Sequence, residues 1–383
     1  MRSGYRPGPV CVASKVGRPP GLYVRSVTGM DTAWLEKFLT SPGNDGRAFS
    51  GVVEVRRDGE VLFQSACGLA SPRWGVANTL DIRFDVASIS KLFTSVAVLQ
   101  LVAAGRLDLD ASIHEYADLT STAIAPAVTL RHLLTHTSGL ADIAEEDEGE
   151  NYAEVFRVVP CHTIVTLRDF LPLFANKPPH FAPGSGSRYC NAGYVVAGMA
   201  VEHASGQGFR EYVEAEVLAR AGMTRSGYFD KRYAIPDLAE GFDPTDDGRL
   251  EQNLYAYPPQ GAPDGGAFCT AGDLHAFFAA LRERQLLPAD LTENFLTPQV
   301  ASADGGPAGQ GFGLEFNDLG YYKEGESEGA SGIFSHLSVW NADIVILSNT
   351  MDGTWPLLGE FVRRAREARG DNTRRSRPKL RGL

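Results

Sequence analysis

The chain has 383 residues, of which 43% are hydrophobic and 22% are charged. These are ordinary values for a globular protein of this length, and they exclude disorder of the whole chain. The formal net charge is −11, but residues 1–29 carry +5 and residues 363–383 carry +7, which leaves −23 on residues 30–362. Because a body this acidic repels a phosphate backbone, we expect no nucleic-acid partner.

The two basic ends flank one expected folded domain, residues 30–362. Residues 1–29 contain no apolar stretch long enough for a secretory signal or a membrane anchor. We therefore expect a cytoplasmic protein with no membrane partner, and interpret residues 1–29 as a disordered leader. Residues 363–383 are expected to be a basic helix end and a disordered tail. The cysteines are odd in number and lack metal-ligand spacing, which fits reduced thiols and no metal site: Cys11, Cys67, Cys161, Cys190 and Cys269.

The domain is expected to begin with a helix, a hairpin and a second helix. Apolar runs at Phe49–Glu54 and Val61–Gln64 flank Asp58-Gly59, which is a strong signal for a two-residue hairpin turn. Apolar residues then continue from Leu92 to Val102 and stop before Gly105. This pattern predicts a buried helix that ends at a glycine.

From about residue 110 to 300 the pattern is mainly helical, and strand signals return only near the end. The expected helices are Thr129–Leu134, Ala192–His203, Phe209–Ala221, Asp273–Leu287 and a last one over Pro356–Arg369. The late strands are expected at Phe312–Phe316, Tyr321–Lys323, Ile333–Trp340 and Ile344–Leu347. Strands at both ends predict an α+β fold, in which one antiparallel sheet is assembled from both chain ends and flanked by helices, with a mainly helical lobe inserted.

One short motif in the second helical segment carries nucleophile chemistry. Ser88 is followed three residues later by Lys91, where the apolar helix begins. Helical spacing places the hydroxyl and the amine on one face, one turn apart. A serine is a weak nucleophile near neutral pH, and an adjacent amine can take its proton. Alone, the motif also fits a helix cap beside a surface lysine, so partners elsewhere in the chain must decide.

Two later segments supply such partners. Tyr189 and Asn191 stand two apart at a loop-to-helix junction, and Lys323-Glu324-Gly325 lies on an expected strand. The ordered motifs Ser-x-x-Lys, Tyr-x-Asn and Lys-x-Gly, with the segment Val128–Leu140, resemble the serine beta-lactamase and penicillin-binding-protein superfamily. Within it, the chain is similar to the class C beta-lactamase-related branch, which includes esterases and D-stereospecific peptidases. The resemblance spans roughly residues 31–362 and implies the beta-lactamase/transpeptidase-like fold.

The resemblance also implies a role for each motif residue. Ser88 would attack an acyl carbon to form an acyl-enzyme, and Lys91 and Tyr189 would share its proton. Tyr189 could act as a base only if Lys91 and Lys323 stabilise its phenolate, and which group takes the first proton stays open. The backbone N–H groups of Ser88 and Glu326 would form the oxyanion hole, with Lys323 and Gly325 beside them. Asn191 would bind a substrate amide or orient Lys91, and no cofactor is implied.

The chain departs from the family pattern at Glu324. Beta-lactamases and penicillin-binding proteins usually carry Thr or Ser there, whose hydroxyl helps to hold the substrate carboxylate. Glu326 and Glu328 follow, and the loop after Leu140 adds further acids, namely Asp142, Glu145, Glu146, Asp147, Glu148 and Glu150. Because like charges repel an anionic ligand, we expect a preference for neutral or cationic esters or amides, although a merely solvated loop is the simpler reading of those acids.

Several alternatives stay open. Beta-lactamase, D-amino-acid peptidase and acyltransferase activities use the same acyl-enzyme, and a non-catalytic ligand-binding or sensor protein could retain the fold. The expected partner is a small ester, amide or lactam, and the sequence does not indicate an oligomeric state. His132 and His136 stand four apart, but no third ligand follows, so we interpret them as part of a packed helix end. Cys190 is interpreted as a small buried residue.

Overall fold

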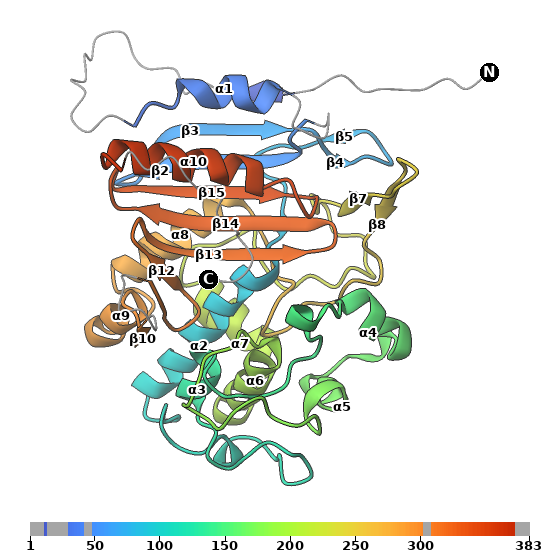
Figure 1. Cartoon of the computed structure of the whole chain (residues 1–383), viewed down its shortest axis with the longest axis vertical. Helices are drawn as coiled ribbons and strands as arrows, with labels where there is room; N and C mark the ends of the chain where they lie inside the picture. Colours follow the sequence, from blue (N-terminus) through green and yellow to red (C-terminus); the bar gives the residue numbers. More distant parts are fainter. Residues whose placement is uncertain (1–10, 14–29, 42–47, 302–307, 372–383) are drawn as a thin grey trace.

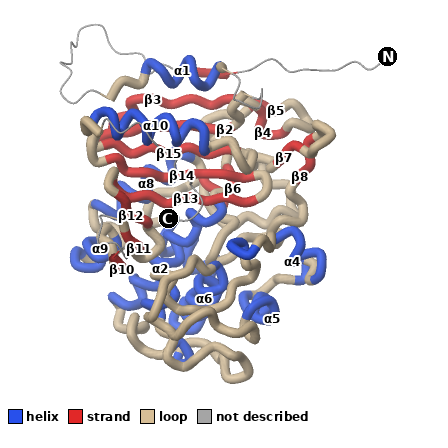
Figure 2. Tube along the Cα trace, viewed as in Figure 1, coloured by secondary structure: helices blue, strands red, loops and turns tan. Residues whose placement is uncertain are grey.

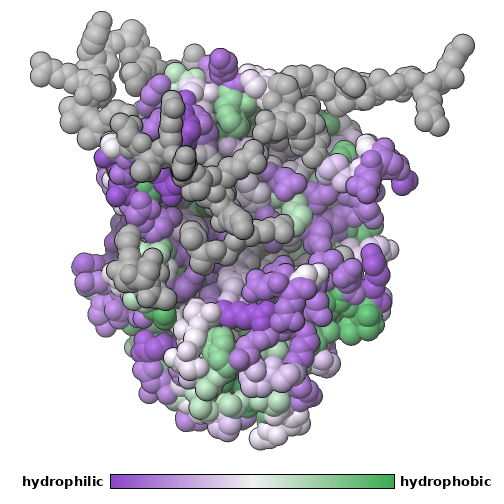
Figure 3. Space-filling model, in the orientation of Figure 1, coloured by the Kyte–Doolittle hydropathy of each residue, from purple (hydrophilic) through white to green (hydrophobic). Residues whose placement is uncertain are grey.

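The computed structural model describes residues 11–13, 30–41, 48–301 and 308–371. A large sheet with helices on both faces forms one part of the molecule, and a lobe of helices and loops forms the other (Figures 1 and 2). Hydrophilic side chains predominate on the described part of the face seen in Figure 3, as expected of a strongly charged body. This arrangement confirms the α+β fold predicted from the sequence.

Strands from both chain ends meet in one antiparallel sheet. Among the described residues its order is β1-β3-β2-β15-β14-β13-β12-β11-β10. Its strands are β1 (Cys11–Ala13), β2 (Gly51–Arg57), β3 (Glu60–Cys67), β10 (Val300–Ala301), β11 (Gly309–Gln310), β12 (Glu315–Asn317), β13 (Gly320–Ser327), β14 (Ala330–Leu337) and β15 (Ala342–Ser348). The early hairpin β2–β3 therefore joins the late strands through β15.

The predicted hairpin turn is confirmed. Asp58 and Gly59 both have positive φ, at 48° and 81°, as a turn that matches the strand twist requires. The late strand predicted at Phe312–Phe316 is wrong in position, since β12 begins only at Glu315. Gly313 adopts a φ of 88°, which interrupts the extended backbone before that point.

Helices cover both faces of the sheet. The amphipathic α1 (Ala33–Thr40) and α10 (Trp355–Ala368) pack their apolar sides on one face (Figure 1). On the other face lie α8 (Ala271–Arg282) and α2 (Lys91–Ala103). Nearly every residue of α2 is buried, as its uniformly apolar sequence predicts, and Gly105 follows its end with a φ of 68°. The start of α2 is thereby held inside the protein, between the sheet and the lobe.

The inserted lobe is built from short helices and one longer helix. Its elements are α3 (Leu130–Leu134), α4 (Tyr152–Val158), α5 (Leu171–Phe174), α6 (Asn191–Ser205) and α7 (Phe209–Tyr212), which continues as a π-helix over Val213–Leu218; α9 (Ala289–Phe295) follows α8. In the described ranges, three two-stranded sheets accompany them, formed by β4 (Leu69–Ser71) with β5 (Val76–Ala77), β6 (Phe84–Asp85) with β9 (Phe268–Cys269), and β7 (Phe242–Pro244) with β8 (Leu250–Gln252). The predicted helix over Ala192–His203 is α6, which ends before Gly206.

From the sequence, the chain ends are expected to form a disordered leader and tail, and the cysteines to be reduced thiols. Most of residues 1–29, and residues 372–383, lie outside the described residues, but Cys11–Ala13 forms β1 and pairs with β3. Cys67 is disulfide-bonded, so the expectation of five reduced thiols is wrong for this residue. The thiols of Cys161, Cys190 and Cys269 are free and buried. Of the helices in the described ranges, none has the length and apolar character that a membrane crossing needs.

Candidate active site

Ser88 lies in a tight turn that is fixed from several sides. The turn is a 3-10 helix, Ala87–Ser90, which joins β6 to α2. Ala87 adopts a φ of 43°, a region that non-glycine residues rarely occupy. The Ser90 hydroxyl donates to the Ala87 carbonyl at 2.7 Å and accepts the N–H of Ala267 at 3.0 Å. The surrounding structure therefore imposes a strained conformation next to Ser88, as is common at functional sites.

Lys91 is buried one turn after Ser88. Its Nζ donates to Ser88 Oγ at 2.9 Å, to Asn191 Oδ1 at 2.7 Å and to the Asp264 carbonyl at 2.6 Å. These three acceptors match the three N–H bonds of a lysine ammonium group. The spacing predicted from the sequence is thus realised, and the simpler reading of a surface lysine is excluded by burial. The contact with Asp264 was not predicted, because its carbonyl arrives from a distant loop.

Tyr189 lies between two lysines. Lys91 Nζ is 5.0 Å and Lys323 Nζ is 4.9 Å from the centroid of its ring. The residue is 36% exposed, and its hydroxyl forms hydrogen bonds with Lys91 and Ser88. Burial raises the pKa of Tyr189 to about 12, while the charge of Lys91 and hydrogen bonds with Lys91 and Ser88 act in the opposite direction. The phenol therefore retains its proton near neutral pH in the resting site.

Asn191 connects Lys91 to a carboxylate at the start of α6. Its Nδ2 donates to Asp142 Oδ2 at 3.1 Å. Asp142 also accepts the backbone N–H groups of Asn191 and Ala192, each at 2.8 Å. Burial raises the pKa of Asp142 to about 6, although these hydrogen bonds lower it. Asp142 caps a helix that has no capping side chain of its own, and this role was not predicted from the sequence.

The strand β13 brings Lys323 and Gly325 to the turn Ala87–Ser90, the candidate nucleophile turn. Lys323 is buried and pairs with Glu315 at 2.9 Å, a partner that the sequence did not reveal. A Cβ atom at Gly325 would lie 2.2 Å from the Val86 carbonyl oxygen and 3.0 Å from Ser88 N. Only glycine allows β13 to approach the turn this closely. This approach carries the backbone of Glu326, the next residue, toward the amide of Ser88.

Glu324 lies on the opposite face of β13. Lys323 pairs with Phe334 in the core beneath α2 and α8, whereas Glu324 pairs with Ile333, which packs with α1 and α10. Successive side chains of a strand point to opposite faces, so Glu324 leaves β13 on the face opposite Lys323 and, unlike Glu326 two residues later, does not line the cavity beside Ser88. The sequence-based assignment of Glu324 to the substrate site stays a prediction, and the wall of this cavity does not support it. Strand register decides on which face of the sheet a side chain lies, and it could not be predicted from the motif alone.

The other residues considered from the sequence have local structural contacts. His132 Nδ1 accepts the N–H of Thr129 at 3.3 Å and caps α3. His136 Nδ1 accepts the N–H of Cys190 at 3.1 Å, and its ring packs 4.4 Å from the ring of Tyr189. Burial, together with the charges of Lys323 and Lys91, lowers the pKa of His136 well below its usual value. A neutral imidazole therefore packs against the ring of Tyr189.

A cavity of about 110 Å³ opens beside Ser88. Its walls come from the nucleophile turn, the segment 146–152, the loop 256–266 and the β13–β14 hairpin. None of the described residues that line it is basic, and five are acidic, namely Asp85, Glu146, Asp264, Glu326 and Glu328. The acidic environment expected from the sequence is therefore present beside Ser88, but its carboxylates differ from Glu324.

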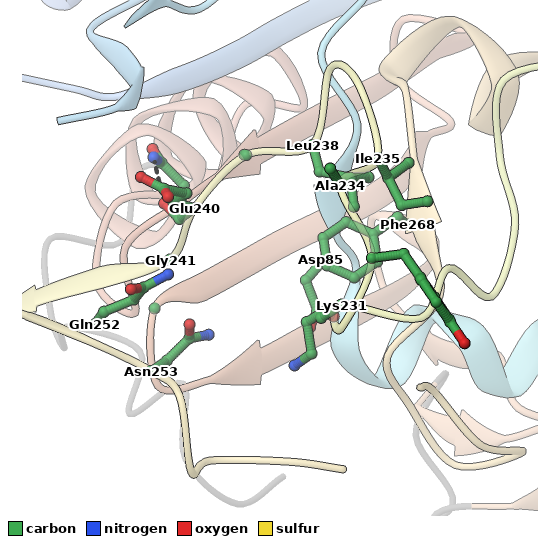
Figure 4. Close-up of a pocket in the computed structure, with 14 residues that line it drawn as sticks. Asp85, Lys231, Ala234, Ile235, Leu238, Glu240, Gly241, Gln252, Asn253 and Phe268 are labelled. Atoms are coloured by element: carbon green, nitrogen blue, oxygen red, sulfur yellow. Dashed lines mark hydrogen bonds between the residues drawn. The ribbon is translucent and has the colours of Figure 1, made fainter. Parts of the chain in front are cut away.

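A second cavity, of about 260 Å³, shares Asp85 with the first (Figure 4). In this close-up Lys231 lies beside Asp85, and Leu238 and Phe268 supply apolar wall. Ser88 does not line this second cavity. Of these two cavities, Ser88 and Asn191 therefore line the smaller, acidic one.

Comparison with known sequences places this geometry in context. The model of the family described as Beta-lactamase matches residues 35–365. The chain is 33% identical over 298 residues to esterase EstB from Burkholderia gladioli, which covers 70% of this chain and 74% of the esterase. It is 30% identical over 296 residues to a D-aminopeptidase from Brucella anthropi, which covers 76% of this chain. That match spans only 53% of the aminopeptidase.

A solved structure agrees with the fold. The crystal structure of a penicillin binding protein from Bacillus halodurans aligns with a TM-score of 0.78 and 34% sequence identity. The alignment covers 82% of this chain and 96% of that protein. The sequence-based expectation of a beta-lactamase/transpeptidase-like fold is thereby confirmed.

Proposed function

Since the chain belongs to the beta-lactamase family and is a serine hydrolase, we propose that Ser88 is its nucleophile and that it cleaves neutral or cationic esters or amides. The observation that carries this proposal is the contact of 2.9 Å between Lys91 Nζ and Ser88 Oγ, inside a buried cluster. A lysine beside a serine hydroxyl is a recurring arrangement for activating that hydroxyl. The esterase and aminopeptidase relatives support acyl transfer.

In the proposed mechanism Ser88 Oγ attacks the substrate carbonyl carbon. Lys91 and Tyr189 relay its proton: as the pair receives the Ser88 proton it gives up one of its own to the leaving oxygen or nitrogen, and the acyl bond breaks, so the pair ends with the same number of protons. The backbone N–H groups of Ser88 and Glu326 stabilise the negative oxygen that develops on the substrate. Water then attacks the acyl-enzyme, which releases the acid and restores the Ser88 hydroxyl.

Tyr189 is suited to deliver a proton in this scheme. With a pKa of about 12 it holds its proton until Lys91 and the reacting oxygen change the local charge. Asn191 holds Lys91 in place through its Oδ1, and Asp142 holds Asn191. Lys323, paired with Glu315, contributes positive charge on the other side of the ring.

Covalent labelling tests the nucleophile. We expect a fluorophosphonate to add one adduct to the wild-type protein, measured by intact mass, and none to Ser88→Ala. Ser187→Ala, which removes an exposed serine hydroxyl from the Tyr189 loop, should label like the wild type. An unlabelled wild type would favour the non-catalytic binding protein, and a labelled Ser88→Ala would show that another residue is the nucleophile.

The remaining expectations stay proposals. A small ester or amide is the proposed partner, and a lactam is a weaker one because the cavity beside Ser88 is acidic. D-amino-acid peptidase activity is the second candidate, favoured by the same carboxylates, which suit a substrate amine. A cytoplasmic location is expected from residues 1–29, which show no signal or anchor, and from reduced thiols; the disulfide-bonded Cys67 contradicts the part that rests on the thiols.

A further inference from the structure

Among the residues that the structure describes, one carboxylate of the acidic cavity has no counter-ion. In the segment 145–150, Glu145, Asp147 and Glu148 each pair with Arg188, and Glu150 lies 3.9 Å from Lys177. Glu146 lines the cavity beside Ser88 and has no ion-pair partner among the described residues. Glu146 is exposed like the other acids of residues 147–150, and its position in the cavity wall is what sets it apart from them. The unpaired carboxylate is the one that reaches the nucleophile's cavity.

A second group in the same cavity also lacks a partner. Tyr152, the first residue of α4, lines the cavity, and its Oη is buried with no hydrogen-bond partner in the described chain. A buried hydroxyl without a partner costs free energy, which a bound ligand with an N–H donor would recover. The neighbouring Tyr257, whose ring lies 6.1 Å from that of Tyr152, donates its own hydroxyl to Asp264 at 2.6 Å. Tyr152 is thus the hydroxyl of this pair that has both its donor and its acceptor positions open to a ligand.

From these two observations we propose that the cavity binds the ammonium group of the substrate. Glu146 supplies the counter-charge, Tyr152 Oη accepts one ammonium N–H, and the aromatic faces of Tyr152 and Tyr257 contribute cation–π attraction. Glu326 and Glu328 add negative potential to the same cavity. The proposal rests on the function proposed above and specifies its substrate: an ester or amide whose acyl part carries a primary ammonium group.

The test compares matched substrates. We would measure kcat/KM for p-nitrophenyl esters of ω-amino acids with three to six carbons, each against the uncharged ester of equal chain length. At one or more chain lengths the wild type should prefer the cationic ester about tenfold, a typical effect of one partly screened charge pair with a hydrogen bond. Glu146→Gln should reduce this ratio to about one. Glu148→Gln removes a charge from the same turn outside the cavity, and should keep the wild-type ratio.

The outcomes separate this inference from the proposed function. Hydrolysis of the neutral esters through Ser88 without a cation preference at any chain length would overturn the ammonium site alone. A wild type without activity or Ser88 adduct would overturn the proposed function itself. If Glu146→Gln does not fold, competition on the wild type decides: n-butylammonium should inhibit neutral-ester hydrolysis at concentrations where n-butanol and butyrate do not, and equal inhibition would overturn the site.

Discussion

The two sides of Ser88 differ in how their polar groups are satisfied. On the inner side, Lys91 has an acceptor for each N–H, and Lys323 pairs with Glu315. On the cavity side, Glu146 has no counter-ion and Tyr152 Oη has no hydrogen-bond partner among the described residues. A hydrogen-bond network in which every group has a partner holds its side chains in fixed positions. Polar groups without a partner are available to bind a ligand. We therefore assign bond-making to the inner side and substrate selection to the cavity side.

The largest effect should come from removing the proposed nucleophile, a change that is confined to the inner side. Ser88→Ala deletes one hydroxyl in a turn held by other bonds, so the melting temperature should change little. We expect kcat to fall about 10⁴-fold or more, measured with a neutral p-nitrophenyl ester. A variant that keeps a tenth of the wild-type rate would refute the assignment.

Tyr189→Phe tests whether the phenol transfers a proton. The ring keeps its place between Lys91 and Lys323, but the proton relay is lost, so kcat should fall about 10³-fold. Tyr194→Phe is the matched control, because Tyr194 also lies over Lys91 but donates its hydroxyl to the Leu134 carbonyl. It should lose stability and keep most activity. Equal losses of kcat in both variants would argue for a structural role of Tyr189.

Gly325→Ala tests the contact between β13 and the nucleophile turn. The new Cβ would meet the Val86 carbonyl oxygen at 2.2 Å, so the strand must move and carry the Glu326 amide with it. We expect a loss of about 10²-fold in kcat, comparable to losing one oxyanion donor. Gly359→Ala, at an open position in α10, should leave kcat unchanged and raise stability slightly. Unchanged kcat in Gly325→Ala would exclude this strand from the oxyanion hole.

Local patterns in the sequence predicted the parts of the site that depend on local geometry. Ser88 and Lys91 are one turn apart, so helical spacing alone brings them together, and Asp58-Gly59 alone defines a hairpin turn. The face of β13 on which Glu324 lies depends instead on strand register. A one-residue difference in register reverses the face of every side chain, so that assignment needed the sheet.

Contacts between distant segments were also beyond the sequence. The Asp264 carbonyl reaches Lys91 across 173 residues, and Asp142 reaches Asn191 across 49. The acidic loop was visible in the sequence, but which of its members lacks a cation depends on where Arg188 lies. The sequence therefore could not distinguish among these acidic residues, because their ion pairs depend on the tertiary structure.

The smallest effect, a pH dependence of selectivity, would sharpen the contrast between the two sides. Glu146 is exposed at the cavity mouth, yet the surrounding walls reduce its hydration, and with the charges of Asp142, Glu326 and Glu328 this raises its pKa to about 7, against the effect of Lys91. The carboxylate fraction therefore rises between pH 6 and 8, while an alkylammonium stays protonated. The kcat/KM ratio of cationic to neutral ester should increase several-fold over this range. Forming the ratio cancels the titration of the inner groups, which act on both substrates alike.

The raised pKa of Glu146 also means that the protein loses stability as the pH rises. The unfolded chain releases the Glu146 proton near pH 4.5 and the folded chain near pH 7, so ionisation costs stability as the pH rises between these values. Glu146→Gln cannot ionise, so its melting temperature relative to the wild type should be higher at pH 8 than at pH 4.5, and its selectivity ratio should be flat with pH. A wild-type ratio that is flat from pH 6 to 8 would instead assign cation preference to groups that are ionised throughout, and would remove Glu146 from the selecting side of Ser88.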